Sequence, residues 1–232
     1  MAGRIAYYGN IVTDGLVLNL DAARKDSYNR TGTTWNDISG NGNNGTLTNG
    51  PTFDSEDYGS IVFDGVDDYV NLGDVLFPSG TTDFTIDIWV NFKDSVVNDY
   101  VFSKGSAAAG IAGSTFYMVT GTNYVRFTAT DSTPTRSTSV EHQGVVINQW
   151  YNFTYTYNGT TITGYRDGGN IMTNTSITGS LQYVNQPIRI GTHTYGSANP
   201  NMDVSNFKIY NRALTQDEIT QNFNALRGRY GI

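Results

Sequence analysis

The feature that most constrains this chain is a two-residue alternation of apolar and polar side chains, most regular in DFTIDIWVNF at residues 83–92. Successive side chains of a β-strand point to opposite faces of its sheet. One face of this segment therefore carries Phe84, Ile86, Ile88, Val90 and Phe92, and the other carries Thr85, Asp87, Trp89 and Asn91. The alternation predicts a strand with one core-facing side and one polar side that includes an aromatic ring.

Similar short segments recur along the chain and nearly all end in Gly, Asn or Asp, which favour turns. They are GLVLNLDA (15–22), SIVFDG (60–65), DYVNLG (68–73), YVFSKG (100–105), STFYMVTG (114–121), YVRFTAT (124–130), WYNFTYTYNG (150–159), TITGYRDG (161–168), PIRIGT (187–192) and DVSNFKIYN (203–211). YNGTTITGY and FTATDSTPTRSTSV are typical of hairpins, the first with an Asn-Gly turn. Many short strands without intervening long helices predict an all-β fold, an antiparallel two-sheet jelly-roll sandwich.

One helix is expected near the C-terminus, over residues 216–226. Thr215 followed three residues later by Glu218 forms a capping-box pattern. The apolar residues that then recur on one face are Ile219, Phe223 and Leu226. Gly228 is placed where a C′ glycine would end the helix. We expect this helix to serve in packing.

Length and composition limit the number of domains and the classes of partner. A chain of 232 residues with regular patterning fits one domain, over 14–232, preceded by an arm at 1–13 that lies on the domain or contacts a neighbour. The net charge of −7 argues against nucleic acid, which is bound through clustered Lys and Arg. The chain has no cysteine, no apolar signal segment at its start and no apolar run long enough to span a membrane. We therefore expect no membrane insertion, and synthesis in the cytoplasm.

The segment WNDISGNGNNGT, residues 35–46, combines Asp, Asn and Gly and buries almost no apolar area. It offers carboxylate, carboxamide and carbonyl oxygens, the ligands that calcium prefers, with Asp37, Asn41 and Asn43 as candidates. The alternative is a loop closed by Asx turns and internal hydrogen bonds, without an ion. A second acidic group is FDGVDDYVNLGD, with Asp64, Asp67, Asp68 and Asp74, which we interpret as a turn and, second, as a backup metal site.

The ordered succession of these motifs, from GLVLNLDA through IVFDGVDDYVNLG to VSNFKIYNRALTQDEI, resembles laminin G-like, concanavalin A-like jelly rolls over residues 14–223. The flanks IVTDGLVLNLDAA and EITQNFNALRGRYGI are similar to laminin G-like virion proteins of tailed phages, including marine myoviruses. This narrower resemblance implies a decoration or fibre component of a virion.

The resemblance also implies a structural calcium ion, because in such domains calcium often pins the Asn-rich loop to the start of the last strand. Here that strand would bring Asp203 or Asn206 towards the loop. The family pattern often has two acidic residues near the final strand, whereas Ser205 and Asn206 follow Val204 here. Fewer charges imply weaker calcium binding or none.

The sequence does not favour an enzyme. Hydrolases with this jelly roll use paired acidic residues, typically spaced Glu-x-Asp-x-x-Glu, and DSEDYG at 54–59 lacks that spacing. Asp87 has no second acid at i+2 or i+5, where Trp89 and Phe92 stand. His142 and His193 are the only histidines, without a catalytic motif around them, and we expect both at the surface.

Two functional hypotheses remain, and they are compatible. One is a virion structural protein, homo-oligomeric through its arm, that contacts other virion proteins. The other is a carbohydrate-binding lectin or adhesion module, and a glycoside hydrolase ranks below both. Aromatic faces with nearby polar groups bind sugars, and the predicted sugar-binding residues are Trp89, Tyr117, His193, Tyr195 and Asn199. The alternative for aromatics such as Trp89 and Trp150 is a core position.

Overall fold

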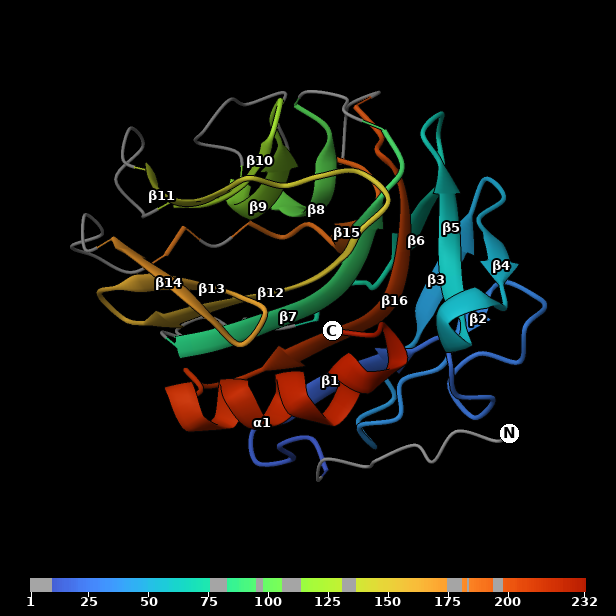
Figure 1. Ribbon diagram of the computed structural model, residues 1–232, viewed down its shortest axis with the longest axis horizontal. Helices are drawn as coiled ribbons and strands as arrows, with labels where there is room; N and C mark the ends of the chain where they lie inside the picture. Colours follow the sequence, from blue (N-terminus) through green and yellow to red (C-terminus); the bar gives the residue numbers. More distant parts are fainter. Residues whose placement is uncertain are drawn as a thin grey trace.

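Two antiparallel sheets of eight strands each pack face to face in the computed structural model (Figure 1). It describes residues 10–75, 83–94, 98–105, 114–130, 137–174, 181–182, 184–193 and 198–232. This architecture confirms the predicted all-β sandwich with one short C-terminal helix.

We name the sheets A and B. Sheet A runs in the order β14 (Gly169–Asn174), β13 (Ile162–Arg166), β12 (Trp150–Asn158), β7 (Asp83–Phe92), β16 (Asn201–Tyr210), β5 (Ser60–Asp64) and β4 (Thr52–Asp54), and β1 (Leu16–Asp21) also pairs with β16. Sheet B runs β11 (Ser137–Gln143), β10 (Tyr124–Thr130), β9 (Ser114–Thr120), β8 (Tyr100–Gly105), β15 (Ile188–Ile190), β6 (Tyr69–Asn71), β3 (Gly45–Thr48) and β2 (Thr34–Trp35). A 3₁₀ turn, η1 (Glu56–Tyr58), joins β4 to β5.

The alternating segments predicted most of these strands, and β7 has the expected bounds. Both hairpins also form, β12 with β13 and β10 with β11. The four strands that the patterns missed are β2, β3, β4 and β14, which lie at a sheet edge or next to one.

Aromatic side chains fill the space between the sheets. Phe84 contacts Phe116 at a ring-centroid distance of 5.5 Å, and Phe127 stacks on Tyr155 at 4.5 Å. The whole predicted core face of β7 is buried, with Phe84, Ile86, Ile88 and Val90 fully inaccessible. The sandwich is therefore held mainly by this shared apolar layer.

The outer face of sheet A is covered by α1 (Gln216–Leu226) and the 3₁₀ turn η3 (Arg227–Arg229). Helix α1 has the predicted bounds, and Thr215 and Glu218 form the predicted capping box. The expected stop at Gly228 is wrong, because the chain continues into η3 and Gly228 does not adopt a positive φ. No helix in the described ranges is both long and apolar enough to cross a bilayer.

Part of the predicted N-terminal arm lies on the domain. The amide of Val12 donates to Asn222 Oδ1 at 2.8 Å, and Tyr210 Oη donates to the carbonyl of Val12 at 3.1 Å. Residues 10–13 are thus fixed against α1, while 1–9 lie outside the described residues.

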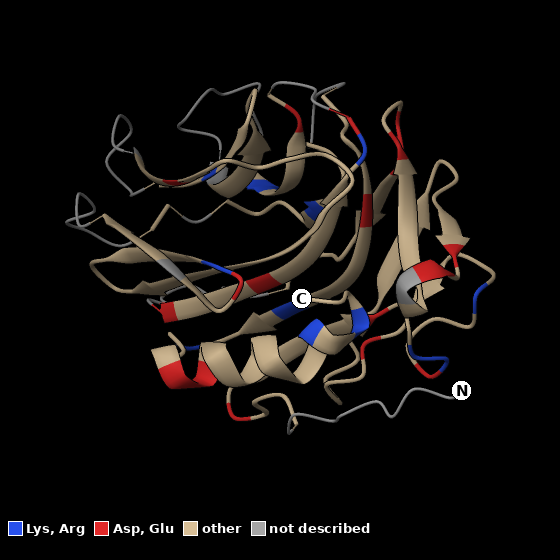
Figure 2. Cartoon of the chain, viewed as in Figure 1, with Lys and Arg blue, Asp and Glu red and all other residues tan. Residues whose placement is uncertain are grey.

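The polar face of β7 is buried as well, beneath the C-terminal segment. Trp89 is fully inaccessible and stacks on Tyr230 at 4.2 Å and on Phe223 at 5.6 Å. Beside it, Asp87 Oδ1 pairs with Lys208 Nζ of β16 at 2.7 Å. Figure 2 shows acidic and basic segments on the adjacent strands β7 and β16, next to the helix. Sheet A therefore needs the C-terminal segment as its second cover.

We expect Tyr230→Ala to lower the free energy of unfolding by about 2 to 4 kcal/mol, because it removes a ring packed on Trp89. It also removes the hydrogen bond from Tyr230 Oη to Ser205 Oγ. Urea unfolding followed by tryptophan fluorescence measures the loss. Ile232→Ala, at a position 40% exposed, is the control and should change stability by less than about 0.5 kcal/mol. Equal stability of the two variants would contradict the covering role of Tyr230.

Candidate functional site

The Asn-rich loop is closed by its own hydrogen bonds. The Asp37 carboxylate accepts four of them, from the amides of Asn19 (2.9 Å), Ser39 (2.8 Å) and Asn43 (3.0 Å) and from Ser39 Oγ (2.8 Å). The side-chain amides of Asn41 and Asn43 donate to carbonyls at the start of β1, including that of Val17. This arrangement matches the alternative of a self-bonded Asx loop.

The residues proposed to complete a calcium site on β16 are not brought to this loop as a set. Asp203 Oδ2 pairs instead with Lys93 Nζ at 2.6 Å. Asn206 Nδ2 donates to Asn19 Oδ1 at 3.2 Å, so β1 lies between Asn206 and Asp37. The amides of Asn41 and Asn43 direct their NH₂ groups inward, whereas calcium needs oxygen ligands. The predicted ligand set does not fit a calcium ion.

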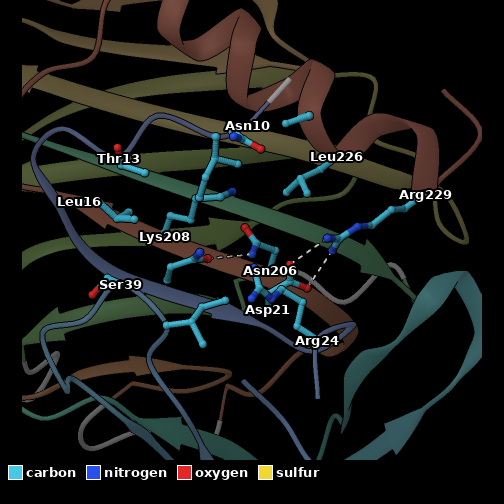
Figure 3. Close-up of a pocket in the computed structure, with 14 residues that line it drawn as sticks. Asn10, Thr13, Leu16, Asp21, Arg24, Ser39, Asn206, Lys208, Leu226 and Arg229 are labelled. Atoms are coloured by element: carbon cyan, nitrogen blue, oxygen red, sulfur yellow. Dashed lines mark hydrogen bonds and ion pairs between the residues drawn. The ribbon is translucent and has the colours of Figure 1, made fainter. Parts of the chain in front are cut away.

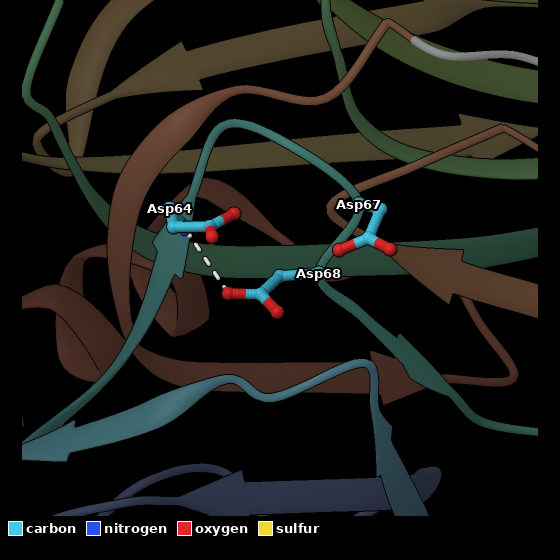
Figure 4. Close-up of side chains that lie close together, drawn as sticks. All are labelled: Asp64, Asp67 and Asp68. Carbon is cyan, nitrogen blue, oxygen red and sulfur yellow. Dashed lines mark hydrogen bonds between the residues drawn. The ribbon is translucent and has the colours of Figure 1, made fainter.

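The second acidic group lies in the turn between β5 and β6 (Figure 4). Carboxylate oxygens of Asp64, Asp67 and Asp68 lie within 4.8 Å of one another, whereas Asp74 forms an ion pair with Lys104 elsewhere. Asp68 accepts from the amide of Asp64, and Asp64 accepts from the amide of Val66. Burial raises the pKa of Asp68, and the charges of Asp64 and Asp67 add to this rise. The turn interpretation is supported, and the backup metal site reduces to three carboxylates.

Two of the predicted sugar-binding residues meet on the outer face of sheet B. Tyr117 of β9 packs edge-on against Tyr100 of β8 with ring centroids 5.6 Å apart, and Tyr100 contacts His193 at 4.5 Å. We call Tyr100, Tyr117 and His193 the tyrosine rim. Both tyrosines are partly exposed, whereas His193 is 2% exposed. Burial lowers the pKa of His193, and the Arg189 charge lowers it further, so the ring is neutral near pH 7.

The other predicted sugar-binding residues lie elsewhere or deeper. Trp89 is on the outer face of sheet A beneath Tyr230, so its assignment to sugar binding is wrong and the core alternative is correct. Asn199 adjoins the rim, since Ala198 accepts from the Tyr100 amide, but it is 7% exposed and bonds the carbonyl of Val66. Tyr195 lies outside the described residues.

Sequence reasoning missed Tyr100, although it begins a predicted strand. Tyr100 begins the predicted strand YVFSKG and Tyr117 lies in the predicted strand STFYMVTG, but neither segment indicates that the two strands are neighbours. The expected surface positions of the two histidines were also wrong. His142 is 1% exposed and packs on Phe153 and Tyr155, and burial, with a lesser effect of Arg166, lowers its pKa to about 4.

The residue before Tyr100 is a buried acid. Asp99 is 5% exposed, and its Oδ2 has no hydrogen-bond partner among the residues that the structure describes. Burial, with a smaller contribution from the Asp94 charge, raises the pKa of Asp99 to about 6. A carboxylate that is buried without a partner destabilises the fold when it ionises.

We expect Asp37→Ala to lower the free energy of unfolding by about 2 to 4 kcal/mol, because three backbone amides lose their acceptor. The loss should be equal in EDTA and in millimolar calcium. Thermal unfolding in both conditions measures it, with Asp26→Ala as the control at an exposed acid. A calcium-dependent rise in Tm that Asp37→Ala abolishes would instead support a calcium ion bound in this loop.

We expect Asp99→Asn to stabilise the protein at pH 7.5 but not at pH 4.5. The folded pKa of Asp99 is about 6 against 3.8 as a free group, so the folded state holds this proton more tightly. Wild-type stability is therefore lost as pH rises from about 4 to 6, by at most about 3 kcal/mol. Urea unfolding of both proteins across this range isolates the effect. A difference between them that does not vary with pH would contradict the buried-acid assignment.

Comparisons with known proteins agree with this fold. A family model described as the concanavalin A-like lectin/glucanases superfamily matches residues 64–220. No protein with a curated description matches the sequence. Similar solved structures include the botulinum neurotoxin serotype D ligand binding domain in complex with N-acetylneuraminic acid, with a TM-score of 0.73, 12% identity, and coverage of 91% of this chain and 51% of that chain.

Two further structures have the same fold. The binding domain of Paraclostridial Mosquitocidal Protein 1 has a TM-score of 0.68 at 19% identity, covering 92% of this chain and 52% of that chain. Trypanosoma rangeli sialidase has a TM-score of 0.69 at 17% identity, covering 91% of this chain and 33% of that chain. This chain thus spans about half or less of the solved chains, and at these identities the likeness shows the fold alone. The family match covers most of the chain, and the protein belongs to the concanavalin A-like lectin/glucanases superfamily.

Proposed function

We propose that this protein is a non-enzymatic, carbohydrate-binding jelly roll that contacts its glycan at the tyrosine rim. The observation that carries the proposal is the contact series from Tyr117 through Tyr100 to His193 on the outer face of sheet B. Two tyrosine rings at an interplanar angle of 62° offer both a face for the C–H surface of a sugar and hydroxyls for its oxygens. The serotype D neurotoxin domain crystallised with N-acetylneuraminic acid supports sialic acid as a first ligand to test.

The absence of catalysis is part of the proposal. Asp87, the acid that stood alone in the sequence, lies beneath the C-terminal segment in an ion pair with Lys208, both 1% exposed. Its second oxygen accepts from Thr154 Oγ1 at 2.9 Å. Glycosidases need two carboxyl groups about 5 to 9.5 Å apart across a bound sugar. Release of a chromophore from aryl glycosides or from an aryl sialoside would contradict this proposal and support the glycoside hydrolase alternative.

We further propose that the module belongs to a virion, as a decoration or fibre subunit displaying the rim to host-surface glycans. The likeness of its two flanking segments to phage virion proteins supports this assignment. A lectin or adhesion module outside a virion is the alternative. The arm is the proposed contact between copies of this chain and with other virion proteins. Removing residues 1–9 keeps the Val12 contacts, and sedimentation that shows unchanged assembly would contradict the role of the arm.

We expect Tyr117→Ala to weaken glycan binding about 5- to 10-fold or more, the loss that corresponds to one aromatic contact of about 1 to 1.5 kcal/mol. Surface plasmon resonance over immobilised sialylated and galactose-terminated glycans measures the Kd. Tyr58→Ala is the matched control, because Tyr58 is 52% exposed in η1, away from the rim. Wild-type affinity in Tyr117→Ala, or equal loss in both variants, would contradict the rim assignment.

A further inference from the structure

A pocket lies on the opposite side of the sandwich from the tyrosine rim. It has a volume of about 330 Å³ and lies between β1, β16, the C-terminal helix and the segments at residues 10–13 and 38–39 (Figure 3). We call it the helix pocket. This volume falls at the lower end of the range for small-molecule sites, about 300 to 1,000 Å³. The pocket therefore has room for one small ring.

The floor of the helix pocket carries an unsatisfied acceptor. Asn206 is 1% exposed, and its Nδ2 is used by Asn19 Oδ1 and the carbonyl of Leu20. Its Oδ1 has no hydrogen-bond partner among the described residues. In Figure 3 the Asn206 side chain stands at the centre of the lining residues, with its oxygen turned away from the bond to Asn19. A buried acceptor of this kind costs about 1 to 3 kcal/mol unless something donates to it.

Next to this acceptor the floor carries a buried charge. Lys208 lines the same pocket two residues along β16, and its ammonium pairs with Asp87 Oδ1. Its side chain is 1% exposed, so the ammonium is held beneath the floor by that pair. A hydroxyl group can donate to Asn206 Oδ1, whereas an anion has no proton to give it.

The walls fit a ring that has C–H surface on both faces. Leu16 and Ile38 line one side, and Leu226 and Ala225 of α1 line the other. At one end, Arg229 forms a two-bond ion pair with Asp21 at 2.8 and 2.9 Å, which fixes η3 against β1. The pocket thus combines apolar walls with a polar floor and is shaped by groups already held in place.

We propose that the helix pocket binds a neutral pyranose, with one ring hydroxyl donating to Asn206 Oδ1. The C–H surface of the ring packs on Leu226 and Leu16. This site is independent of the tyrosine rim, because the two lie on the outer faces of different sheets. The protein then has two carbohydrate contacts on opposite sides of one sandwich, so that it can bridge two glycan chains.

The test is an NMR titration of the ¹⁵N-labelled full chain with the methyl glycosides of glucose, galactose and N-acetylglucosamine. Each is taken to about 20 mM, well above the roughly 1 mM Kd that about 4 kcal/mol of binding gives. Glycerol is the control ligand, because it offers hydroxyls without a ring. We expect saturable shifts of the Asn206 side-chain amide and the Leu226 backbone amide with at least one glycoside and not with glycerol.

Two variants and two controls assign the shifts. Ala225→Trp fills the pocket from α1 and should abolish them, while Asn224→Trp, one residue earlier and not lining the pocket, should retain them. Thr13→Trp, at an exposed position on the pocket mouth, should weaken binding at least 5-fold and serves if Ala225→Trp does not fold. Tyr117→Ala should leave these shifts unchanged.

The outcomes separate this proposal from the proposed rim. No saturable shift at Asn206 and Leu226, or shifts that persist in Ala225→Trp and Thr13→Trp, would overturn the helix pocket, with water left as the partner of Asn206. Shifts confined to the rim would overturn the pocket and keep the rim. Shifts confined to the pocket, insensitive to Tyr117→Ala, would keep the pocket and count against the rim.

Discussion

The stack of Tyr230 and Phe223 on Trp89 is the contact on which the arrangement of sheet A depends. A sandwich buries the inner faces of its two sheets against each other, and its outer faces normally meet water. The outer face of β7 cannot do so, because it carries Trp89 and a charged pair, Asp87 with Lys208, both desolvated. The C-terminal helix therefore acts as a third layer, and the N-terminal residues are fixed to it in turn through Asn222.

That third layer explains which parts of the fold the sequence could predict. Period-two alternation reports that two faces differ, and it predicted the bounds of β7 and its core residues correctly. It cannot report what covers the second face. Trp89 on a polar face is compatible with an exposed sugar platform or with a covered core position, and the choice depends on residues 223 and 230, far along the chain. The helix itself was predictable because capping and 3.6-residue periodicity are local signals.

The Asn-rich loop shows a different limit. Its composition correctly indicated that backbone and side-chain oxygens hold it, but an inventory of oxygens does not say whether protons or a metal ion satisfy them. The structure places four donors on Asp37 and turns the amides of Asn41 and Asn43 towards carbonyls. Strand β1 separates this loop from β16, so the sequence order of the motifs did not determine their neighbours. Two residues of the tyrosine rim, Tyr117 and His193, were predicted from the sequence, and Tyr100 was missed. Tyr117 and His193 are joined through Tyr100, and a contact between strands is not contained in any local pattern.

The two outer faces differ in the kind of recognition they allow. The rim presents aromatic rings from two neighbouring strands of sheet B, a surface suited to the side of a long glycan. The helix pocket is enclosed by the same C-terminal segment that protects Trp89, and its floor is made by Asn206 and Lys208, whose strand partners in β7 are Trp89 and Asp87. The lining of the pocket is held by contacts of the covering layer, such as the ion pair of Arg229 with Asp21, so a ring that bound there would not have to order the protein first. The covering layer therefore creates the pocket as a consequence of protecting the sheet.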